Sequence, residues 1–348
     1  MRRLGRTEKS DAIRRFLLSL VQGGRRSIVN ETASLFGISQ QAVYRHINHL
    51  VRHDFLVIEG RARQRVYRLG PKRWFAATYD LSSIDENTVH ERDFSFVFES
   101  LPVNISEICH YGFTEMVNNA IDHSEGTNVA IEAVRDEKNV LIVIRDDGEG
   151  IFCRIARLLN LNDTRESLLE LSKGKLTTDP KHHTGEGIFF TSRVFDHFVI
   201  RSGDLDFSHV YRDELDWLLH SDDETAGTIV AMRIAVDSAR ELEAVFSEFS
   251  DDPDEYRFER TVVPVRLALY EGEHLVSRSQ AKRLLSRIER FRYVILDFEG
   301  VDSIGQSFAD EAFRVFKNRH PEIEITAINM SERVNKMINR ALQEQRKS

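Results

Sequence analysis

Two residues near the middle of the chain have the types and the spacing needed to hold a magnesium ion and to activate an oxygen nucleophile. Glu115 and Asn119 belong to a stretch whose apolar residues recur at helical spacing, which predicts a helix from about Ser106 to Asp122. Residues four apart on a helix share one face. A carboxylate there polarises a water molecule or a hydroxyl group, and an amide oxygen is a ligand that Mg²⁺ accepts.

Two glycine-containing motifs follow along the chain. An apolar run over residues 140–144 predicts a buried strand that leads into Asp146–Gly150, whose glycines let the backbone approach a flat ligand closely. Gly185 and Gly187 precede an apolar helix, and a glycine-rich helix N-terminus is a common phosphate-binding site. Each motif alone is commonly a simple turn. The prediction of a ligand site depends on the three motifs occurring together in this order.

The ordered set resembles the GHKL superfamily of ATP-binding domains, which includes gyrase-type ATPases, heat-shock chaperones, mismatch-repair ATPases, histidine kinases and anti-sigma serine kinases. The resemblance covers about residues 90–235 and implies an α/β sandwich of the Bergerat type that binds ATP and Mg²⁺. The matching segments are Glu115 and Asn119 for the N box, Asp146–Gly150 for the adenine-binding motif, Gly185–Gly187 for the phosphate-binding glycines, and Gly227–Thr228, before a predicted strand over residues 229–234, for a position near adenine.

The resemblance also implies a role for each matching residue. Glu115 would be the general base, and Asn119 would hold Mg²⁺. The charged interval after the adenine motif corresponds to the ATP lid of the superfamily, where Lys173 and Lys175 would close over the triphosphate. A charged surface loop is the alternative interpretation of these lysines. The implied nucleotide contacts are Asn119, Asp146, Gly148, Gly150, Lys173, Lys175, Gly185, Gly187 and Thr228.

The composition is typical of a chain with more than one hydrophobic core and no membrane anchor. The 348 residues are 41% apolar, and this length is long for a single core. No apolar run approaches the roughly 18 residues of a membrane span, and the first residues lack the apolar stretch of a signal peptide. Cys109 and Cys153 are too few for a disulfide framework and lack metal-ligand spacing. We therefore expect a cytoplasmic protein.

The first 75 residues are strongly basic. They contain 16 Lys and Arg against 5 Asp and Glu, a net charge of +11, whereas the whole chain carries −8 and its remainder therefore −19. A basic module on an acidic body is the electrostatic footprint of a nucleic-acid-binding domain. Helical periodicity over residues 11–21, 31–36 and 40–53, with Gly37 between the last two, gives the order of a helix-turn-helix.

The third predicted helix and the β-hairpin after it resemble the winged helix-turn-helix of bacterial regulators. Ser39 is the expected N-cap of this helix, and Val43, Ile47 and Leu50 would face the core. The remaining side chains would read base edges and phosphates in the major groove, and arginines at the hairpin tip would contact the backbone or the minor groove. A basic, protein-docking winged helix is the alternative. The candidate DNA contacts are Gln40, Gln41, Tyr44, Arg45, Arg61, Arg63 and Arg65.

The last third of the chain reads as a separate α/β unit. An acidic, proline-containing stretch over residues 250–255 predicts a boundary, and strand-like and helical segments alternate after it. The segment Val294–Glu311 resembles the STAS fold of anti-sigma-factor antagonists, in which a serine in a strand-to-helix turn accepts phosphate from a GHKL kinase. Ser303 and Ser307 lie in that turn, although the antagonist Asp-Ser-Ser-Gly pattern is absent. Capping of the following helix is the alternative role of Ser307.

We therefore predict a multi-domain chain that combines α+β and α/β architecture. The expected domains are a winged helix-turn-helix over residues 1–75, a GHKL domain with its leading linker over residues 76–250, and a STAS-like domain over residues 251–348. The predicted function is a bacterial transcription regulator that binds double-stranded DNA and is switched by binding or hydrolysis of Mg²⁺-ATP. The alternative is an anti-sigma-type serine kinase that phosphorylates its own STAS-like domain or that of a partner.

Further partners follow from the same resemblances. A second copy of the chain is one, because winged-helix proteins commonly read two half-sites, and a sigma or anti-sigma-type regulatory protein is another. A sensor histidine kinase is disfavoured, because the sequence lacks the long dimerisation hairpin of those enzymes and any membrane segment.

Overall fold

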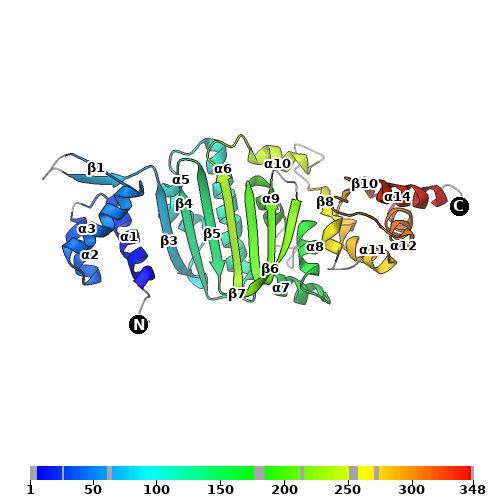
Figure 1. The fold of residues 1–348 in the computed structure, drawn as a ribbon, viewed down its shortest axis with the longest axis horizontal. Coiled ribbons are helices and arrows are strands. Elements are labelled where there is room, and N and C mark those ends of the chain that lie inside the picture. Colours follow the sequence, from blue (N-terminus) through cyan, green and yellow to red (C-terminus); the bar gives the residue numbers. More distant parts are fainter. Residues whose placement is uncertain are drawn as a thin grey trace.

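The computed structural model describes residues 6–25, 27–60, 65–175, 185–211, 215–250, 258–269 and 274–345. The chain forms three units in a row (Figure 1). The N-terminal unit ends with a two-stranded hairpin at Leu69, the central unit is built on a five-stranded sheet and extends to residue 250, and the C-terminal unit is built on a three-stranded sheet from residue 258 onward.

The N-terminal unit consists of three helices and an antiparallel hairpin. Its elements are α1 (Arg6–Gln22), α2 (Ile28–Phe36), α3 (Gln40–Arg52), β1 (Leu56–Glu59) and β2 (Val66–Leu69). Leu17, Ile47 and Leu50 are fully buried in a core that belongs to this unit. Gly37 ends α2 in the left-handed conformation that glycine adopts without strain. The predicted cap of α3 is confirmed, because the Ser39 hydroxyl accepts a hydrogen bond from the Ala42 amide at 3.2 Å.

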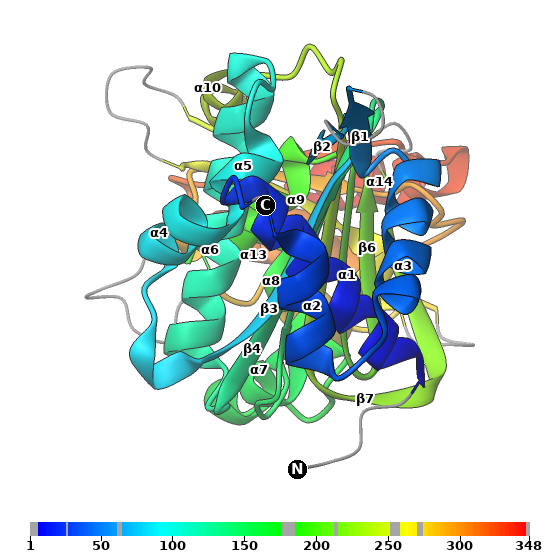
Figure 2. The same ribbon diagram turned by 90° about the vertical axis from the view of Figure 1, so that its left-hand side faces the viewer.

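The central unit is an antiparallel sheet with strand order β3-β4-β5-β7-β6. Figure 2 shows α4, α5, α6 and α9 together beside the strands. In chain order the elements are β3 (Arg73–Asp80), η2 (Leu81–Ser83), α4 (Glu86–Val89), η3 (His90–Phe94), α5 (Ser95–Phe98), α6 (Val103–His123), β4 (Asn128–Arg135), β5 (Asn139–Asp146), α7 (Ile151–Leu159), α8 (Glu166–Ser172), α9 (Gly187–Val194), β6 (His197–Val210), β7 (Leu215–Ala235) and α10 (Leu242–Glu248).

Alternating burial along the strands explains why the helices pack where they do. On β4, Val129 and Ile131 are buried, and on β5, Ile142 and Ile144 are buried, whereas the residues between them are more exposed. This period-two pattern gives the sheet one apolar face, which the helices cover.

Residues 78–97, where the leading linker and the entry to the central domain were expected, form regular structure rather than a linker. β3 begins at Arg73, crosses the expected boundary between residues 75 and 76, and pairs with β4 over its full length. The segment after it is helical, and Phe94 and Val97 are completely buried. One turn of this segment, η3, is a π-helix, which adds a residue to the turn and breaks the regular helical spacing of apolar residues.

The C-terminal unit has a parallel sheet with strand order β10-β9-β8. Its first strand ends at Pro264, and the Ser331 hydroxyl accepts a hydrogen bond from the Val334 amide at 3.1 Å at the start of the last helix. The elements are β8 (Arg260–Pro264), η4 (Val265–Ala268), α11 (Arg278–Leu284), η5 (Ile288–Arg290), β9 (Tyr293–Asp297), α12 (Gln306–Ala309), η6 (Asp310–Val315), α13 (Phe316–Arg319), β10 (Glu324–Ile328) and α14 (Glu332–Gln345).

The central and C-terminal units share one hydrophobic core. A continuous cluster of buried side chains runs from Leu81 to Ala341. Phenylalanines join the two units, with ring centroids 4.5 Å apart for Phe189 and Phe258 and 5.3 Å apart for Phe258 and Phe291. The C-terminal unit is therefore packed on the central one rather than separate from it, and most of the predicted acidic boundary lies outside the described residues.

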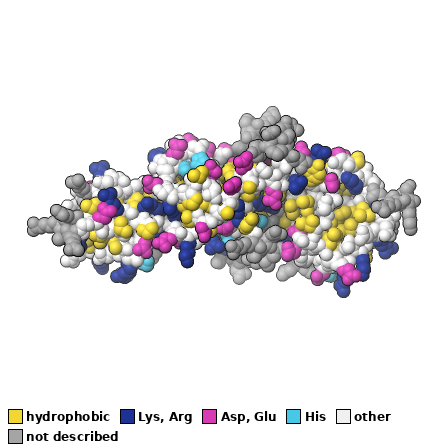
Figure 3. All heavy atoms as spheres, turned by 90° about the horizontal axis from the view of Figure 1, so that it is seen from above, with side chains coloured by type: hydrophobic (Ala, Val, Ile, Leu, Met, Phe, Trp, Pro, Cys, Tyr) yellow, Lys and Arg dark blue, Asp and Glu magenta, His cyan; other side chains and the backbone are white. Residues whose placement is uncertain are grey.

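One face of the molecule shows side chains of both charges. On the face that Figure 3 shows, Lys and Arg side chains are interspersed with Asp and Glu side chains and with hydrophobic ones. Within the described part of the chain, no helix is long and apolar enough to cross a membrane.

Candidate functional site

Helix α6 presents the predicted carboxylate and amide to a cavity of about 320 Å³. Its apolar face, which includes Phe113, Met116 and Val117, packs into the core, so Glu115 and Asn119 lie together on the cavity side. The predicted helix over 106–122 is confirmed, and the observed helix is slightly longer at both ends. A cavity of this volume lies within the range of small-molecule sites, roughly 300–1,000 Å³.

The end of β5 forms a second wall of the cavity. Asp146 is 8% exposed, and its Oδ1 accepts hydrogen bonds from the Gly148 amide at 3.0 Å and the Thr228 amide at 3.1 Å. Thr228 Oγ1 in turn accepts from the Ile151 amide at 3.0 Å. Burial raises the pKa of Asp146 above its ordinary value. Thr228 therefore lies beside Asp146 as expected, although β7 runs through this position instead of starting after it.

The glycines of the Asp146 loop act through close backbone contacts. A Cβ atom on Gly148 would lie 2.0 Å from the Ser124 carbonyl oxygen. Gly150 has φ +92°, and a Cβ there would lie 2.5 Å from the Ser202 hydroxyl. Neither glycine lines the cavity. Their effect on a ligand is therefore indirect, through the position that they allow Asp146 and α7 to take.

The second glycine pair lies at the N-terminus of α9 and lines the cavity. Gly185 has φ +72°, and α9 begins at Gly187. A Cβ on Gly187 would lie 2.0 Å from Oε2 of Glu115, so a side chain there would require the Glu115 carboxylate to move. The first backbone amides of α9 thus lie beside the predicted base, where a helix N-terminus favours anionic groups.

The two predicted lid lysines do not line the cavity. Lys173 is almost completely buried, and its Nζ donates to Glu170 Oε1 at 2.7 Å and to the Ser286 carbonyl at 2.8 Å. Nζ of Lys175 donates to the Arg290 carbonyl at 3.1 Å. Burial lowers the pKa of both lysines. In this structure both contact the C-terminal unit, whose carbonyl groups and aromatic rings replace the water that a surface loop would offer them.

Several cavity residues were not predicted from the motifs. Arg154 on α7 lines the cavity, and its Nη1 donates to Glu125 Oε1 at 2.5 Å. The spacing of Ile151, Arg154, Ile155 and Leu158 places them on one face of α7, a signal that the sequence contains. The other lining residues outside the motifs are Met116, Asn118, Ala120, His123, Ser124, Ile144, Leu171, Ile188, Phe189 and Val230.

The donor set of the cavity fits a magnesium ion only in part. Among the described residues, no group of three or more His, Cys, Asp and Glu side chains lies close enough to hold a metal ion. Mg²⁺ commonly keeps several waters and binds through one or two protein oxygens together with phosphate oxygens of a substrate. The Asn119 amide and the nearby Glu115 carboxylate are compatible with that mode and not with a protein-only metal site.

The outer face of α3 carries the predicted DNA contacts. Gln40, Gln41, Tyr44 and Arg45 are exposed, while the alternate face of the helix is buried in the core of the unit. Nε2 of Gln40 donates to the Asn30 side chain at 2.9 Å. The hairpin arginine Arg65 is also exposed. The other two hairpin arginines, Arg61 and Arg63, lie outside the described residues.

The two candidate phosphoacceptors lie around the start of α12. Ser303 is half-buried and Ser307 is exposed. The prediction that Ser307 caps the helix is wrong, because Gly305 holds the N-cap position and the helix begins at Gln306. The extended backbone of Gly305 lets the helix start earlier, which puts Ser307 inside the first turn.

Comparison with known proteins identifies only the C-terminal part. Residues 280–335 match the family described as a STAS-like domain of unknown function (DUF4325), from within α11 to the first turn of α14. A STAS-like domain is therefore present in the C-terminal unit. The comparison with curated proteins finds no match.

The neighbouring carboxyls of the cavity loop should affect stability in opposite directions. Burial raises the pKa of Asp146, so ionisation of this carboxyl opposes folding. Its contribution to the free energy of unfolding therefore falls as pH rises above the ordinary carboxyl range. Hydrogen bonds from Asn128 and Thr127 hold the pKa of Asp147 well below its usual range. The ionised carboxylate therefore stabilises the fold at neutral pH, and this stabilisation is lost as pH falls. At pH 7, we expect Asp146→Asn to keep or raise the melting temperature and Asp147→Asn to lower it.

Thermal unfolding followed by circular dichroism between pH 3 and 8 measures both variants against the unchanged protein. The gap between their melting temperatures should narrow as pH falls through the carboxyl range. A gap that stays constant with pH would show that packing, and not ionisation, causes it.

Proposed function

We propose that the chain is a DNA-binding regulator whose central unit binds Mg²⁺-ATP. The main support for this proposal is that residues from separate segments of the chain line a single cavity. These residues are Glu115 and Asn119 on α6, Asp146 at the end of β5, Gly185 and Gly187 at the start of α9, and Thr228 on β7. Segments far apart in the sequence, each with a residue type that the GHKL resemblance assigns to the nucleotide, meet at one place.

The chemistry of the walls suits an adenine ring at one end of the cavity. Ile144, Ile151 and Val230 supply apolar surface for the faces of a flat ring. The buried Asp146 carboxylate can accept a hydrogen bond from an exocyclic amine, because an ionised carboxylate has only acceptor sites. The Gly148 and Thr228 amides both donate to Oδ1. A ring with an amine donor therefore fits this end better than one with only acceptors.

The other end of the cavity suits the phosphates. The N-terminus of α9 offers backbone amides next to Glu115. When bound there, Mg²⁺ would neutralise phosphate charge, with the Asn119 amide oxygen as a protein ligand. Glu115 would accept the proton of a water molecule, or of a serine hydroxyl, as it attacks the terminal phosphate.

Removal of the predicted base should separate binding from turnover. We expect Glu115→Ala to keep ATP affinity within a few-fold and to lower phosphate release by about 10²–10⁴-fold, the usual contribution of a general base. Calorimetry with Mg²⁺-ATP measures binding, and release of labelled phosphate measures turnover. Asp146→Asn is the companion variant. It keeps an oxygen for the two loop amides and turns an NH₂ donor toward the ring amine, so ATP affinity should fall.

The ATP proposal would fail if the unchanged protein bound no ATP. The role given to Glu115 would fail if Glu115→Ala abolished binding while the protein still unfolded cooperatively.

The N-terminal unit supports the DNA part of the proposal. Its three helices and hairpin present the exposed side chains of α3, and the first 75 residues carry a net charge of +11. Arg45 stands on this exposed face, where a guanidinium contacts guanine or phosphate in duplex DNA.

Loss of Arg45 should weaken DNA binding and leave ATP binding unchanged. We expect Arg45→Ala to cost roughly 1–3 kcal/mol, about one order of magnitude or more in affinity for duplex DNA. Fluorescence anisotropy with a labelled pool of random duplexes, over a range of salt concentrations, measures the effect. Lys336→Ala is the charge-matched control, because Lys336 is an exposed residue of α14 in the C-terminal unit. Equal losses in the two variants would contradict a specific role of α3.

Serine phosphorylation is a second candidate function because of one specific observation. The STAS-like match contains Ser307, which is exposed on the first turn of α12 and so accessible to a kinase. Figure 1 shows α8 and α11 between α9 and α12, so transfer to Ser307 in this arrangement would come from a second molecule.

Labelled ATP distinguishes the two functions. If the chain is an ATP-gated regulator, γ-labelled ATP should yield free phosphate and no labelled protein. If it is a serine kinase, label should remain on the protein and disappear in Ser307→Ala. Retention of label in Ser307→Ala, with loss in Ser303→Ala, would assign the acceptor to the other serine.

A further inference from the structure

Lys175 and Arg290 form a reciprocal clasp between the central and C-terminal units. Nζ of Lys175 donates to the Arg290 carbonyl at 3.1 Å, and Nη1 of Arg290 donates to the Lys175 carbonyl at 2.7 Å. The Lys175 ammonium also lies over two aromatic rings of the C-terminal unit, 5.5 Å from the centroid of Phe258 and 5.0 Å from that of Phe291. Four contacts therefore hold this one residue on the C-terminal unit.

The backbone at the clasp is in an unfavourable conformation. Gly174 has φ +74°, and Lys175 has φ +49°, which is a costly value for a residue with a side chain. A Cβ on Gly174 would lie 2.6 Å from the Phe258 ring, so the chain turns here in close contact with the C-terminal unit. The clasp offsets the strain at Lys175, and release of the clasp would relieve it.

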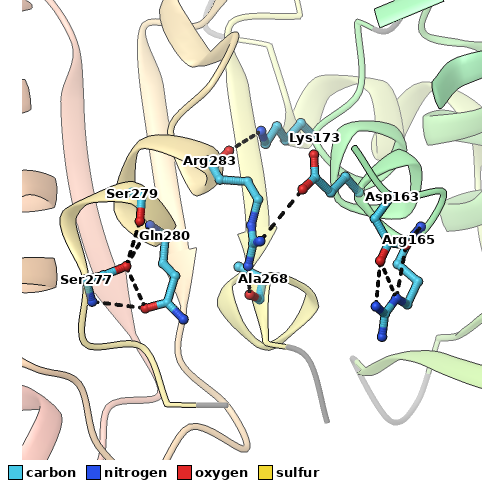
Figure 4. A network of polar contacts seen from close by, with 9 residues as sticks. Asp163, Arg165, Lys173, Ala268, Ser277, Ser279, Gln280 and Arg283 are labelled. Atoms are coloured by element: carbon cyan, nitrogen blue, oxygen red, sulfur yellow. Dashed lines mark hydrogen bonds and ion pairs between the residues drawn. The ribbon is translucent and has the colours of Figure 1, made fainter. Parts of the chain in front are cut away.

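The segment before the clasp is anchored much more firmly. Figure 4 shows the Lys173 ammonium directed at the backbone carbonyl of Arg283, 3.5 Å away, where α8 meets the C-terminal unit. The Lys173 ammonium is paired with Glu170 in a buried site, and the Thr261 hydroxyl donates to the Lys173 carbonyl at 2.7 Å. Removing a charge from such a buried pair is costly. Movement at this contact is therefore easier at Lys175 than at Lys173.

Lys175 lies close to the α9 side of the cavity. Its Nζ is 5.5 Å from the centroid of Phe258, and that ring is 4.5 Å from the ring of Phe189, a cavity-lining residue in the first turn of α9. Among the described residues that line the cavity, Arg154 is the only Lys or Arg. Among the described residues outside the cavity wall, Lys175 is a cation that a polyphosphate at the N-terminus of α9 would attract.

We propose that the triphosphate of ATP and the Arg290 carbonyl compete for Lys175, so that nucleotide binding opens the clasp and loosens the C-terminal unit. This inference rests on the proposed ATP site. A phosphate oxygen carries negative charge and the Arg290 carbonyl does not, so the phosphate adds a Coulombic attraction to the Lys175 ammonium that the carbonyl lacks. By thermodynamic reciprocity, a variant that weakens the clasp binds the triphosphate more tightly.

Hydrogen exchange of the full-length protein tests the opening of the clasp. The probes are Mg²⁺-ATPγS and adenosine, which lacks phosphates. With ATPγS, amides over residues 144–151 should become protected, and amides over residues 288–292, next to Arg290, should exchange faster. Adenosine should protect residues 144–151 and leave residues 288–292 unchanged.

Two failures of this experiment are distinguishable. Protection of 144–151 by ATPγS without faster exchange at 288–292 overturns the competition and leaves the ATP site standing. No protection of 144–151 by either probe overturns the ATP site and the competition together.

Matched arginine variants test the reciprocal effect. Arg290→Gln removes the donor to the Lys175 carbonyl. ATPγS should then bind about three- to tenfold more tightly, which corresponds to the net free energy of one hydrogen bond. Adenosine affinity should not change. Arg292→Gln is the control, because the Arg292 guanidinium lies 5.3 Å from the Tyr293 ring and takes no part in the clasp. Phe291→Leu removes one ring beneath the Lys175 ammonium and should act in the same direction as Arg290→Gln. Unchanged or weaker ATPγS binding in both clasp variants, with normal melting temperatures, overturns the competition.

Discussion

The candidate site depends on close approach of backbone segments that only glycine permits. A Cβ on Gly227 would lie 2.2 Å from the carbonyl oxygen of Asp146, and one on Gly187 would lie 2.0 Å from the Glu115 carboxylate. Gly148 stands equally close to the Ser124 carbonyl. These contacts bring β7, α9 and the end of α6 within reach of one another around the cavity. A side chain at Gly148 or Gly227 would push backbone segments apart, whereas a side chain at Gly187 would displace the Glu115 carboxylate.

Much of this arrangement could be predicted, because it follows from local rules. The spacing of Glu115 and Asn119 fixes a shared helical face, whatever the rest of the fold does. The glycines and Asp146 mark a strand end and a helix start that propensity alone indicates. The outward face of α3 follows in the same way from the burial of Val43 and its helical neighbours.

The incorrect or missed predictions involve tertiary contacts. The lysines of the expected lid were predicted either to close over the triphosphate or to lie in a charged surface loop, because nothing local shows that the C-terminal unit covers them. The π-turn at residues 90–94 hid the apolar periodicity of a packed helical segment. Arg154 was missed because its importance depends on where α7 lies relative to the cavity, although its spacing on the helix was visible. The predicted cap at Ser307 was wrong because the helix starts two residues earlier than expected, and helix ends are the least certain feature of a sequence-based assignment.

The cavity also lies between the two other units, and each meets the central sheet through a different kind of contact. β3 follows the hairpin of the N-terminal unit directly, and its Trp74 donates to Glu132 on β4 at 2.8 Å while its ring packs near Phe55. This attachment runs through the edge strand β3, and no residue of β3 lines the cavity. The C-terminal unit instead contacts α8 and α9, which supply Leu171 and Phe189 to the cavity. A change in the cavity is therefore transmitted more directly to the C-terminal unit than to the N-terminal one, because two cavity elements form part of that interface.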